Sequence, residues 1–294
     1  MQLDELRTFV TLAEVKNFTK TAERLLMSQP SVSLHIKNLE KEFQTELFIR
    51  SPKILKITPS GELFLERAKH IISIYEATKQ DILELHESVR GPLKIGASFT
   101  IGEYLLPSIL VDLQKRYSEL EIEITIGNTE EIAGLVQQVQ VDIGLIEGEV
   151  HHKDVTVVPF MEDELFIVAS STHPLANKEE LDISDLQHQS WITREKGSGT
   201  RDYLWHLLSS NGLKKESMIT ISSNQGIKES VKNGLGITLL SQYVIDKEIE
   251  NGSLQKLKLS NHLFKRKLFY LYLPLMQEKR NVKAFVEALE TNMK

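Results

Sequence analysis

The chain contains no cysteine among its 294 residues. This excludes disulfides, thiolate-bound zinc, a cysteine nucleophile and any sensor that works by oxidising a thiol. The sequence also has no cofactor fingerprint and no nucleophile–base set, so we expect neither an enzyme nor a bound cofactor. His151 and His152 are a weak metal candidate, because adjacent side chains point apart, and we expect no metal site.

Long apolar runs are missing as well. No stretch approaches the roughly 18–20 residues that a bilayer crossing needs. Residues 1–5 are acidic and lead into an amphipathic pattern, whereas a secretion signal has basic residues followed by an apolar stretch. We therefore expect a cytoplasmic protein with no membrane partner.

The net charge of −6 would argue against a nucleic-acid partner, but the charge is unevenly distributed. Residues 16–56 carry four acidic side chains against eight basic ones. A basic footprint of this size, doubled in a dimer, is sufficient to attract phosphates. The eight basic residues are Lys16, Lys20, Arg24, Lys37, Lys41, Arg50, Lys53 and Lys56.

The apolar spacing near the N-terminus predicts three helices, over residues 3–15, 19–26 and 29–43. Ser28 suits the N-cap of the third helix and Pro30 its first turn. An apolar stripe over Val32, Ile36, Leu39 and Phe43 leaves short polar side chains on the opposite face, as in a helix that contacts base edges. The alternative is an ordinary three-helix scaffold with a solvated polar face.

A two-stranded hairpin is predicted next, with residues 47–50 and 54–58 flanking a basic turn. Such a wing places basic side chains near phosphates or the minor groove. The predicted DNA-contacting residues of the helices are Thr19, Gln29, Pro30, Ser31, Ser33, Leu34 and Lys37, and those of the wing are Arg50, Lys53 and Lys56.

A long helix is predicted from Pro59, with Thr58 as its N-cap, to about Val89. Its apolar positions follow a heptad repeat, which predicts pairing with a second copy of the helix. The alternative is packing on the chain's own C-terminal domain. The repeat consists of Phe64, Ala68, Ile71, Tyr75, Thr78, Ile82, Leu85 and Val89.

Residues 18–25 (FTKTAERL), 28–33 (SQPSVS), 36–40 (IKNLE) and 47–50 (LFIR) resemble the N-terminal motif of LysR-type transcriptional regulators, and TPSG at 58–61 resembles the start of that family's linker helix. Many members have arginine where this chain has Leu34, so one base contact would differ. The resemblance implies double-stranded DNA, RNA polymerase and further copies of the chain, assembled as a dimer of dimers, as partners.

The resemblance also implies a fold of mixed α+β and α/β class. It comprises a winged helix-turn-helix domain at 1–58, a coiled-coil linker helix at 59–90 and an effector-binding domain at 91–294. That last domain would have two lobes, like a type II periplasmic binding protein, with lobe I at 91–161 and 267–294 and lobe II at 162–266. Periodicity by itself predicts two sets of alternating strands and helices, each forming a parallel sheet covered on both faces.

Ligands of open α/β sheets lie beyond the carboxyl ends of strands, near helix N-termini. In the second set of strands, the segment KGSGTR precedes a helix, and its glycines, hydroxyls and arginine suit a small oxyanion. The alternative is a flexible loop capped by Thr200. The predicted effector-binding residues are Ser98, Thr100, Gly102, Asn128, Thr129, Glu147, Gly197, Ser198, Gly199, Thr200, Arg201 and Asn224.

Two roles remain open for Glu147: an ion pair with Arg201, or acceptance of a proton from the ligand. Residues 97–102, 141–148 and 195–201 resemble the LysR-type branch that controls sulfur assimilation and sulfite handling, which implies sulfite, sulfate or a related small anion as effector. An amino acid or other small carboxylate is the alternative. We thus expect a ligand-responsive DNA-binding regulator, rather than an enzyme or an uptake protein on the same fold.

Overall fold

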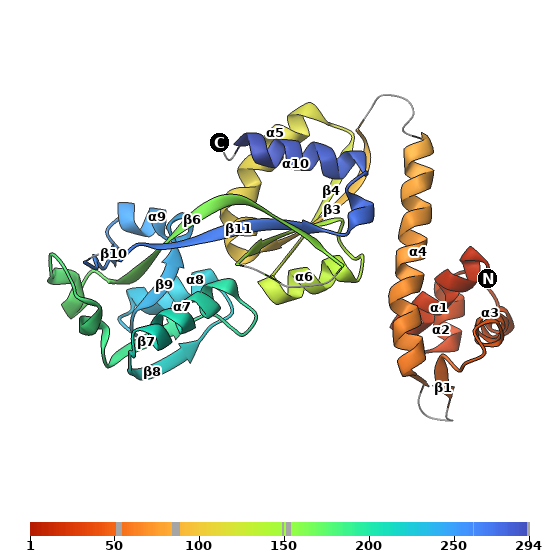
Figure 1. Ribbon diagram of the computed structural model, residues 1–294, viewed down its shortest axis with the longest axis horizontal. Helices are drawn as coiled ribbons and strands as arrows, with labels where there is room; N and C mark the ends of the chain where they lie inside the picture. The colour runs from red at the N-terminus through yellow and green to blue at the C-terminus, as the bar shows by residue number, and fades with distance from the viewer. Residues whose placement is uncertain (51–54, 84–88, 149, 151–153, 261, 293–294) are drawn as a thin grey trace. The chain divides into compact units, whose positions relative to one another are not determined.

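The computed structural model describes residues 1–50, 55–83, 89–148, 150, 154–260 and 262–292 (Figure 1). The chain divides into two compact units, Met1–Glu87 and Ser88–Lys294. Among the helices of these ranges, none has both the length and the hydropathy of a membrane span.

The first unit is a winged helix-turn-helix, as predicted. Asn17 caps α2 by accepting a hydrogen bond from the Lys20 backbone, and Ser28 caps α3 in the same way, with Pro30 in the first turn. Thr58 caps α4, because its hydroxyl accepts from the Gly61 backbone at 2.9 Å. The elements are α1 (Leu3–Val15), α2 (Phe18–Arg24), α3 (Gln29–Glu42), the hairpin β1 (Phe48–Arg50) and β2 (Leu55–Ile57), and α4 (Pro59–Leu83).

The core of this unit forms where α1, α3 and α4 meet. Phe9 of α1 lies at its centre, with its ring centroid 5.2 Å from that of Phe48 and 4.9 Å from that of Phe64. Val32, Ile36 and Leu39 are fully buried, as the predicted stripe of the third helix requires, whereas Phe43 is 44% exposed. The polar face of α3 is therefore directed away from the core.

The predicted heptad repeat does not form one continuous seam. Phe64 and Ala68 are buried within the chain's own helix-turn-helix core, and Val89 packs on the core of the second unit. Ile71 and Tyr75 are exposed, as is the neighbouring Ile74. The side chains of Ile82 and Leu85 lie outside the described set. A 3.5-residue period shows that one face of a helix is apolar, but it does not show what covers that face.

The second unit is built on a seven-stranded mixed sheet and a smaller parallel pair, β7–β8. The large sheet has the order β10-β6-β11-β5-β3-β4, with β9 paired to β6. Its strands are β3 (Gly91–Ser98), β4 (Leu120–Gly127), β5 (Ile143–Glu147), β6 (Thr156–Ser170), β9 (Thr238–Ser241), β10 (Leu254–Lys256) and β11 (Phe264–Tyr272), and the smaller pair is β7 (Gln189–Thr193) and β8 (Lys215–Thr220).

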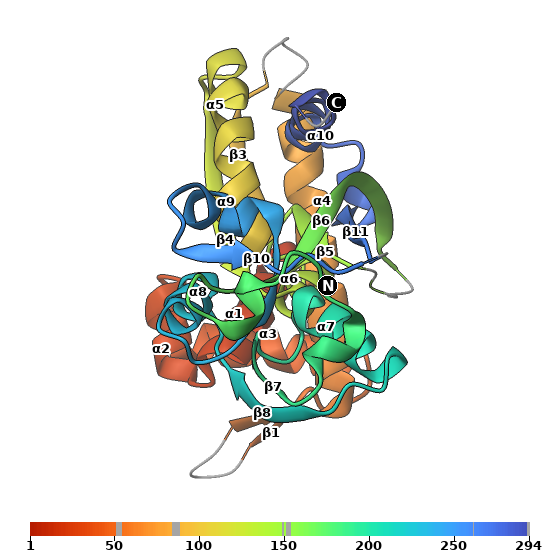
Figure 2. The ribbon, with the colours of Figure 1, turned by 90° about the vertical axis from the view of Figure 1, so that its left-hand side faces the viewer.

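The helices divide between two lobes, as the resemblance implied. In lobe I, α5 and α10 lie on one side of β3 and α6 on the other; lobe II carries α7, α8 and α9 (Figures 1 and 2). They comprise the π-helical turn η1 (Ile101–Leu105), α5 (Leu106–Arg116), α6 (Thr129–Gln137), α7 (Gly199–Ser210), α8 (Asn224–Lys232), α9 (Gln242–Glu250) and α10 (Arg280–Asn292), with the 3-10 turns η2 (Pro174–Asn177), η3 (Ile183–Leu186) and η4 (Pro274–Met276).

Two long strands, β6 and β11, run through both lobes side by side (Figure 1). They pair antiparallel from Leu165 opposite Phe264 to Thr156 opposite Tyr272. The first half of β6 is mostly half-buried and lacks a clear apolar alternation, whereas its second half is largely buried. The predicted parallel pairing is confirmed for β3–β4, β3–β5 and β7–β8. In the second set, however, β6 and β9 pair antiparallel, so the single parallel sheet expected there is wrong.

The sheet is also not covered on both faces throughout. At its edge, β4 leaves Ile124 and Ile126 more than a third exposed, and Val111 on α5 is exposed nearby. An apolar surface on a sheet edge is a common place for protein–protein contact.

Candidate DNA-binding face and effector site

The exposed face of α3 carries most of the side chains predicted to touch DNA. Gln29, Leu34 and Lys37 are exposed and Ser33 is partly exposed; together with Phe48 and Ile49 of β1 they line an open groove of about 780 Å³. The amide of Gln29 donates to the Ser33 hydroxyl at 3.0 Å. The helix therefore presents hydrogen-bonding groups outward while its opposite side packs on the core.

The remaining predicted DNA contacts surround this groove or lie beyond the described residues. Pro30 lines the groove, Thr19 is exposed at the start of α2, and the Ser31 hydroxyl pairs with that of Ser28. Lys56 is exposed on β2. Lys53 and the side chain of Arg50 lie outside the part of the chain that the structure describes, as do His151 and His152.

In the second unit, residues from both lobes meet around the guanidinium of Arg266. Its Nη1 donates to Glu147 at 2.7 Å and to the Thr200 hydroxyl at 2.9 Å. Its Nε donates to Asp163 at 2.7 Å. We call this group of side chains the Arg266 cluster; it consists of Thr100, Glu147, Asp163, Thr200, Ser241 and Arg266.

Each carboxylate of the cluster has further donors. The Thr100 backbone N–H and the Thr200 hydroxyl both donate to Glu147 at 3.0 Å, and the Ser241 hydroxyl donates to Asp163 at 2.7 Å. Both carboxylates and Arg266 are buried. One guanidinium thus bridges two carboxylates that come from different strands, β5 and β6.

The pKa values of the two buried carboxyl groups, Glu147 and Asp163, are shifted in opposite directions. Burial by itself would raise the pKa of Glu147, but Arg266 and the hydrogen bonds from Thr100 and Thr200 lower that pKa below its ordinary value. Burial raises the pKa of Asp163 despite its contact with Arg266. Glu147 is therefore an ionised carboxylate at neutral pH, stabilised by donors from both lobes.

A second buried guanidinium lies beside the cluster. Arg194 forms a two-point ion pair with Glu195 at 2.8 and 2.9 Å and donates to the Asn224 amide oxygen at 3.1 Å. Its guanidinium carbon lies 4.3 Å from the ring centroid of Phe99. Because Phe99 belongs to lobe I and Arg194 to lobe II, this contact also joins the lobes.

The glycine-rich segment before α7 is fitted closely against lobe I. A Cβ on Gly199 would lie 2.2 Å from the carbonyl oxygen of Glu147, so no other residue fits there, and Gly197 adopts a φ of +88°. The Thr129 hydroxyl donates to the Glu147 carbonyl at 3.1 Å, and the Asn128 amide donates to the Lys196 carbonyl at 3.5 Å. The segment therefore has defined neighbours, unlike a freely flexible loop.

Other predicted site residues have different environments. Ser98 is buried, and its hydroxyl has no hydrogen-bond partner among the described residues. Ser198 is buried at the N-cap of α7, without a side-chain capping bond. Packing accounts for Gly102, since a Cβ there would lie 2.9 Å from the Ile126 side chain.

One of the two roles considered for Glu147 is wrong. Its ion-pair partner is Arg266 and not Arg201, whose guanidinium donates to the Arg194 carbonyl at 3.0 Å and lies over Trp205. Sequence reasoning missed Arg266, Arg194 and Asp163 as site residues. A signal for Arg266 was present, because it occupies the inward phase of its strand between Phe264 and Leu268.

Comparison with known proteins identifies the chain's family. Residues 3–62 match the model of the bacterial regulatory helix-turn-helix protein, lysR family. Residues 86–294 match the model of the LysR substrate binding domain. The chain belongs to the LysR family of transcriptional regulators. Membership confirms the predicted DNA-binding regulator and the expectation that the chain is not an enzyme.

Individual LysR-type proteins are similar over most of the chain. The HTH-type transcriptional regulator CysL of Bacillus subtilis (strain 168) is 53% identical over 292 residues, 99% of this chain and 98% of CysL. A full-length OxyR variant from Pseudomonas aeruginosa superimposes with a TM-score of 0.78 at 25% identity, covering 98% of this chain and 94% of that one. The regulatory domain of CcmR from Synechocystis PCC6803, solved in complex with 2-PG, gives a TM-score of 0.65 at 26% identity, covering 70% of this chain and 98% of that one.

The Arg266 cluster yields a stability prediction. Replacing Arg266 with methionine leaves two buried carboxylates without their shared cation, so we expect a loss of about 3–5 kcal/mol in the unfolding free energy of the second unit. The matched control is Lys265→Met on the same strand, where the lysine is exposed and its ion pair with Glu162 is largely solvated. Calorimetric unfolding of the two variants measures the difference; equal transitions would show that Arg266 contributes no special stability.

Proposed function

We propose that this LysR-type regulator responds to a small oxyanion, such as sulfite or sulfate, bound between the two lobes of its second unit. In this proposal residues 1–58 bind DNA, residues 59–90 pair with a second copy and residues 91–294 bind the effector. The anion changes the geometry of the DNA-bound oligomer and so controls transcription, with sulfur-metabolism genes as targets. The observation that supports the proposal most directly is the set of hydrogen-bond donors from both lobes around Glu147.

The chemistry of these donors favours a compact anion. A guanidinium, hydroxyls and backbone N–H groups near the start of a helix are the groups that bind oxyanions in proteins. Thr100 and Thr200 supply such donors from opposite lobes, and the Ser98 hydroxyl is buried without a partner among the described residues. Sulfite and sulfate carry several acceptor oxygens on one sulfur atom. Such a compact anion suits donors from short side chains that lie close together.

The sulfur assignment is supported by the resemblance of three sensor segments to the sulfur-assimilation branch. The 53% identity with CysL, over nearly the full length of both chains, makes that protein the natural reference for comparing effectors and promoters. The alternative effector, an amino acid or another small carboxylate, would use the same guanidinium and hydroxyl donors through two oxygens instead of three or four.

Calorimetric titration of the full chain distinguishes these effectors. At constant ionic strength we expect saturable heat with sulfite or sulfate and none with chloride, because only the oxyanions present several acceptors to the donors of both lobes. Saturable heat with an amino acid or a small carboxylate, and none with sulfite, sulfate or thiosulfate, would contradict the oxyanion proposal.

On the DNA side, we propose that α3 lies in the major groove and that the wing contacts the backbone. A glutamine can pair with adenine through two hydrogen bonds, and a leucine can pack on a thymine methyl group. Gln29 and Leu34 are exposed on the same face for these roles, with Lys37 alongside. Lys56, Arg50 and Lys53 would neutralise phosphates.

Two classes of variant should separate base contacts from phosphate contacts. Gln29→Ala should relax sequence preference at one position by about 1–3 kcal/mol, with smaller effects elsewhere. Lys56→Ala should weaken binding to all sequences about equally. It should also reduce the slope of log affinity against log salt concentration by about one for each subunit. Binding assays on a set of single-base operator variants, repeated at several salt concentrations, measure both effects. An unchanged sequence preference for the Gln29 variant would remove that side chain from base readout.

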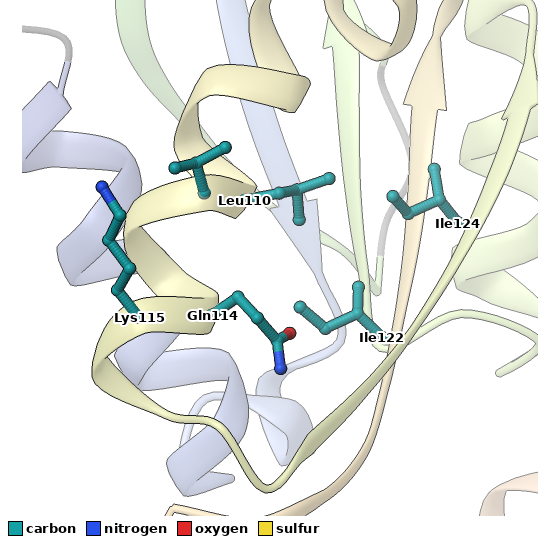
Figure 3. A pocket seen from close by; sticks show the side chains of 6 residues that line it. Leu110, Gln114, Lys115, Ile122 and Ile124 are labelled. Carbon is teal, nitrogen blue, oxygen red and sulfur yellow. The ribbon is translucent and has the colours of Figure 1, made fainter.

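We further propose that the chain assembles as a dimer of dimers through two self-complementary surfaces. One is the exposed apolar face of α4, which includes Ile71, Ile74 and Tyr75. The other is an open groove of about 560 Å³ between α5 and β4, lined by Leu110, Val111, Gln114, Lys115, Ile122 and Ile124 (Figure 3). Two different two-fold interfaces in one chain generate a closed tetramer, and linking four DNA-binding units raises their effective concentration on the operator.

The second surface has a matched pair of test variants on neighbouring positions of β4. Ile124→Glu places a charge in the apolar groove and should convert tetramers into dimers, whereas Thr125→Glu, on the opposite face of the strand, should not. Analytical ultracentrifugation at micromolar concentration measures the assembly. The same mass for both variants would contradict a role of this groove in assembly.

A further inference from the structure

We infer that the Glu147 carboxylate is a built-in competitor of the effector: it accepts the hydrogen bonds that an external anion would accept, and it must release them when that anion binds. The inference rests on the proposed function, in which a small anion binds at this place. It adds a resident anion that sets how much effector is needed for a response.

The geometry around Glu147 is that of a bound oxyanion. One carboxylate oxygen accepts from the Thr100 backbone N–H of lobe I at 3.0 Å. The other accepts from the Thr200 hydroxyl of lobe II at 3.0 Å and from Arg266 at 2.7 Å. A backbone donor, a hydroxyl in the first turn of α7 and a guanidinium are the groups expected to hold an effector, and here a side chain of the protein uses all three.

The local charge prevents Glu147 and an effector from sharing these donors. The titratable groups that face Glu147 are Arg266 on β11, Asp163 on β6 and Arg194 after β7. Asp163 already pairs with Arg266, and Arg194 already pairs with Glu195. An anion added beside an ionised Glu147 would place a further negative charge next to a buried guanidinium that already has two carboxyl partners, and like charges repel strongly there.

Exchange of the two anions also has a mechanical consequence. Glu147 ends β5 in lobe I, and its contact with Thr200 joins that strand to α7 in lobe II. When the carboxylate leaves, the oxygens of the effector replace it, and the lobes are joined through a ligand in place of a side chain. Effector binding requires the carboxylate to leave. The apparent affinity for the effector is therefore the intrinsic affinity multiplied by the fraction of molecules in which the carboxylate has already left.

The test compares the wild-type full chain with Glu147→Gln, which keeps the shape of the side chain and removes its charge. Sulfite and sulfate are titrated by calorimetry, with the operator-binding activity of each protein checked in parallel. We expect the variant to bind sulfite or sulfate at least about tenfold more tightly, since a neutral amide repels the anion far less. Glu164→Gln, which removes a charge from β6 outside the cluster, is the matched control and should bind like the wild type.

A second measurement does not depend on the amide being tolerated. Glu147→Ala removes the resident carboxylate, so the melting temperature of this variant should be below that of the wild type. Millimolar sulfate should raise the melting temperature of the variant by more than it raises that of the wild type. Anion rescue of this kind is not expected if Glu147 only fills space.

The possible outcomes separate the two hypotheses. Tighter binding by Glu147→Gln, including binding where the wild type shows none, supports the internal competitor. If the wild type binds and the variant binds equally or more weakly, the inference is wrong while the proposed function stands. If neither protein binds sulfite or sulfate although both bind operator DNA, the oxyanion proposal fails, and this inference fails with it.

Discussion

The organisation of the sensor unit depends on the contacts that the buried guanidinium of Arg266 makes. It bridges Glu147 at the end of β5 and Asp163 on β6, and it also contacts Thr200 at the start of α7. A buried cation is tolerated only when its charge is compensated and its donors are used. Because its partners come from both lobes, this one guanidinium joins the end of β5 in lobe I to β6 and α7 in lobe II.

The same architecture explains how sensing and DNA binding can be separate yet linked. The side chains proposed to contact DNA belong to the first unit, mostly on α3 and the wing, whereas the proposed effector donors all belong to the second. A signal from the effector donors has to travel between two separately compact units of the chain. In the proposed tetramer, the apolar groove between α5 and β4 would couple one sensor unit to the next.

The sequence predicted local elements well because their causes are local. The turn at Ser28 and Pro30, the buried stripe of α3 and the glycine segment before α7 all follow from residues within a few positions of each other. Glu147 and Thr100 could be found because strand ends meet at one edge of a sheet.

Errors arose where a residue's partner is distant in the sequence. Phe64 and Ala68 have the spacing of a coiled coil, but α1 covers them. Arg266 pairs with residues more than 100 positions earlier, and no local pattern specifies that pairing. Glu147 was correctly placed but given the wrong candidate arginine, because the sequence shows which charges are near a strand end but not which of them face inward.

The most direct test of the central claim is a pair of crystal structures of the full chain, one without added anion and one with sulfite or sulfate. The account predicts that, with the anion bound, its oxygens accept from the Thr100 backbone and the Thr200 hydroxyl while the Glu147 carboxylate has moved off both donors. An anion bound between the lobes with both Glu147 contacts intact would contradict it.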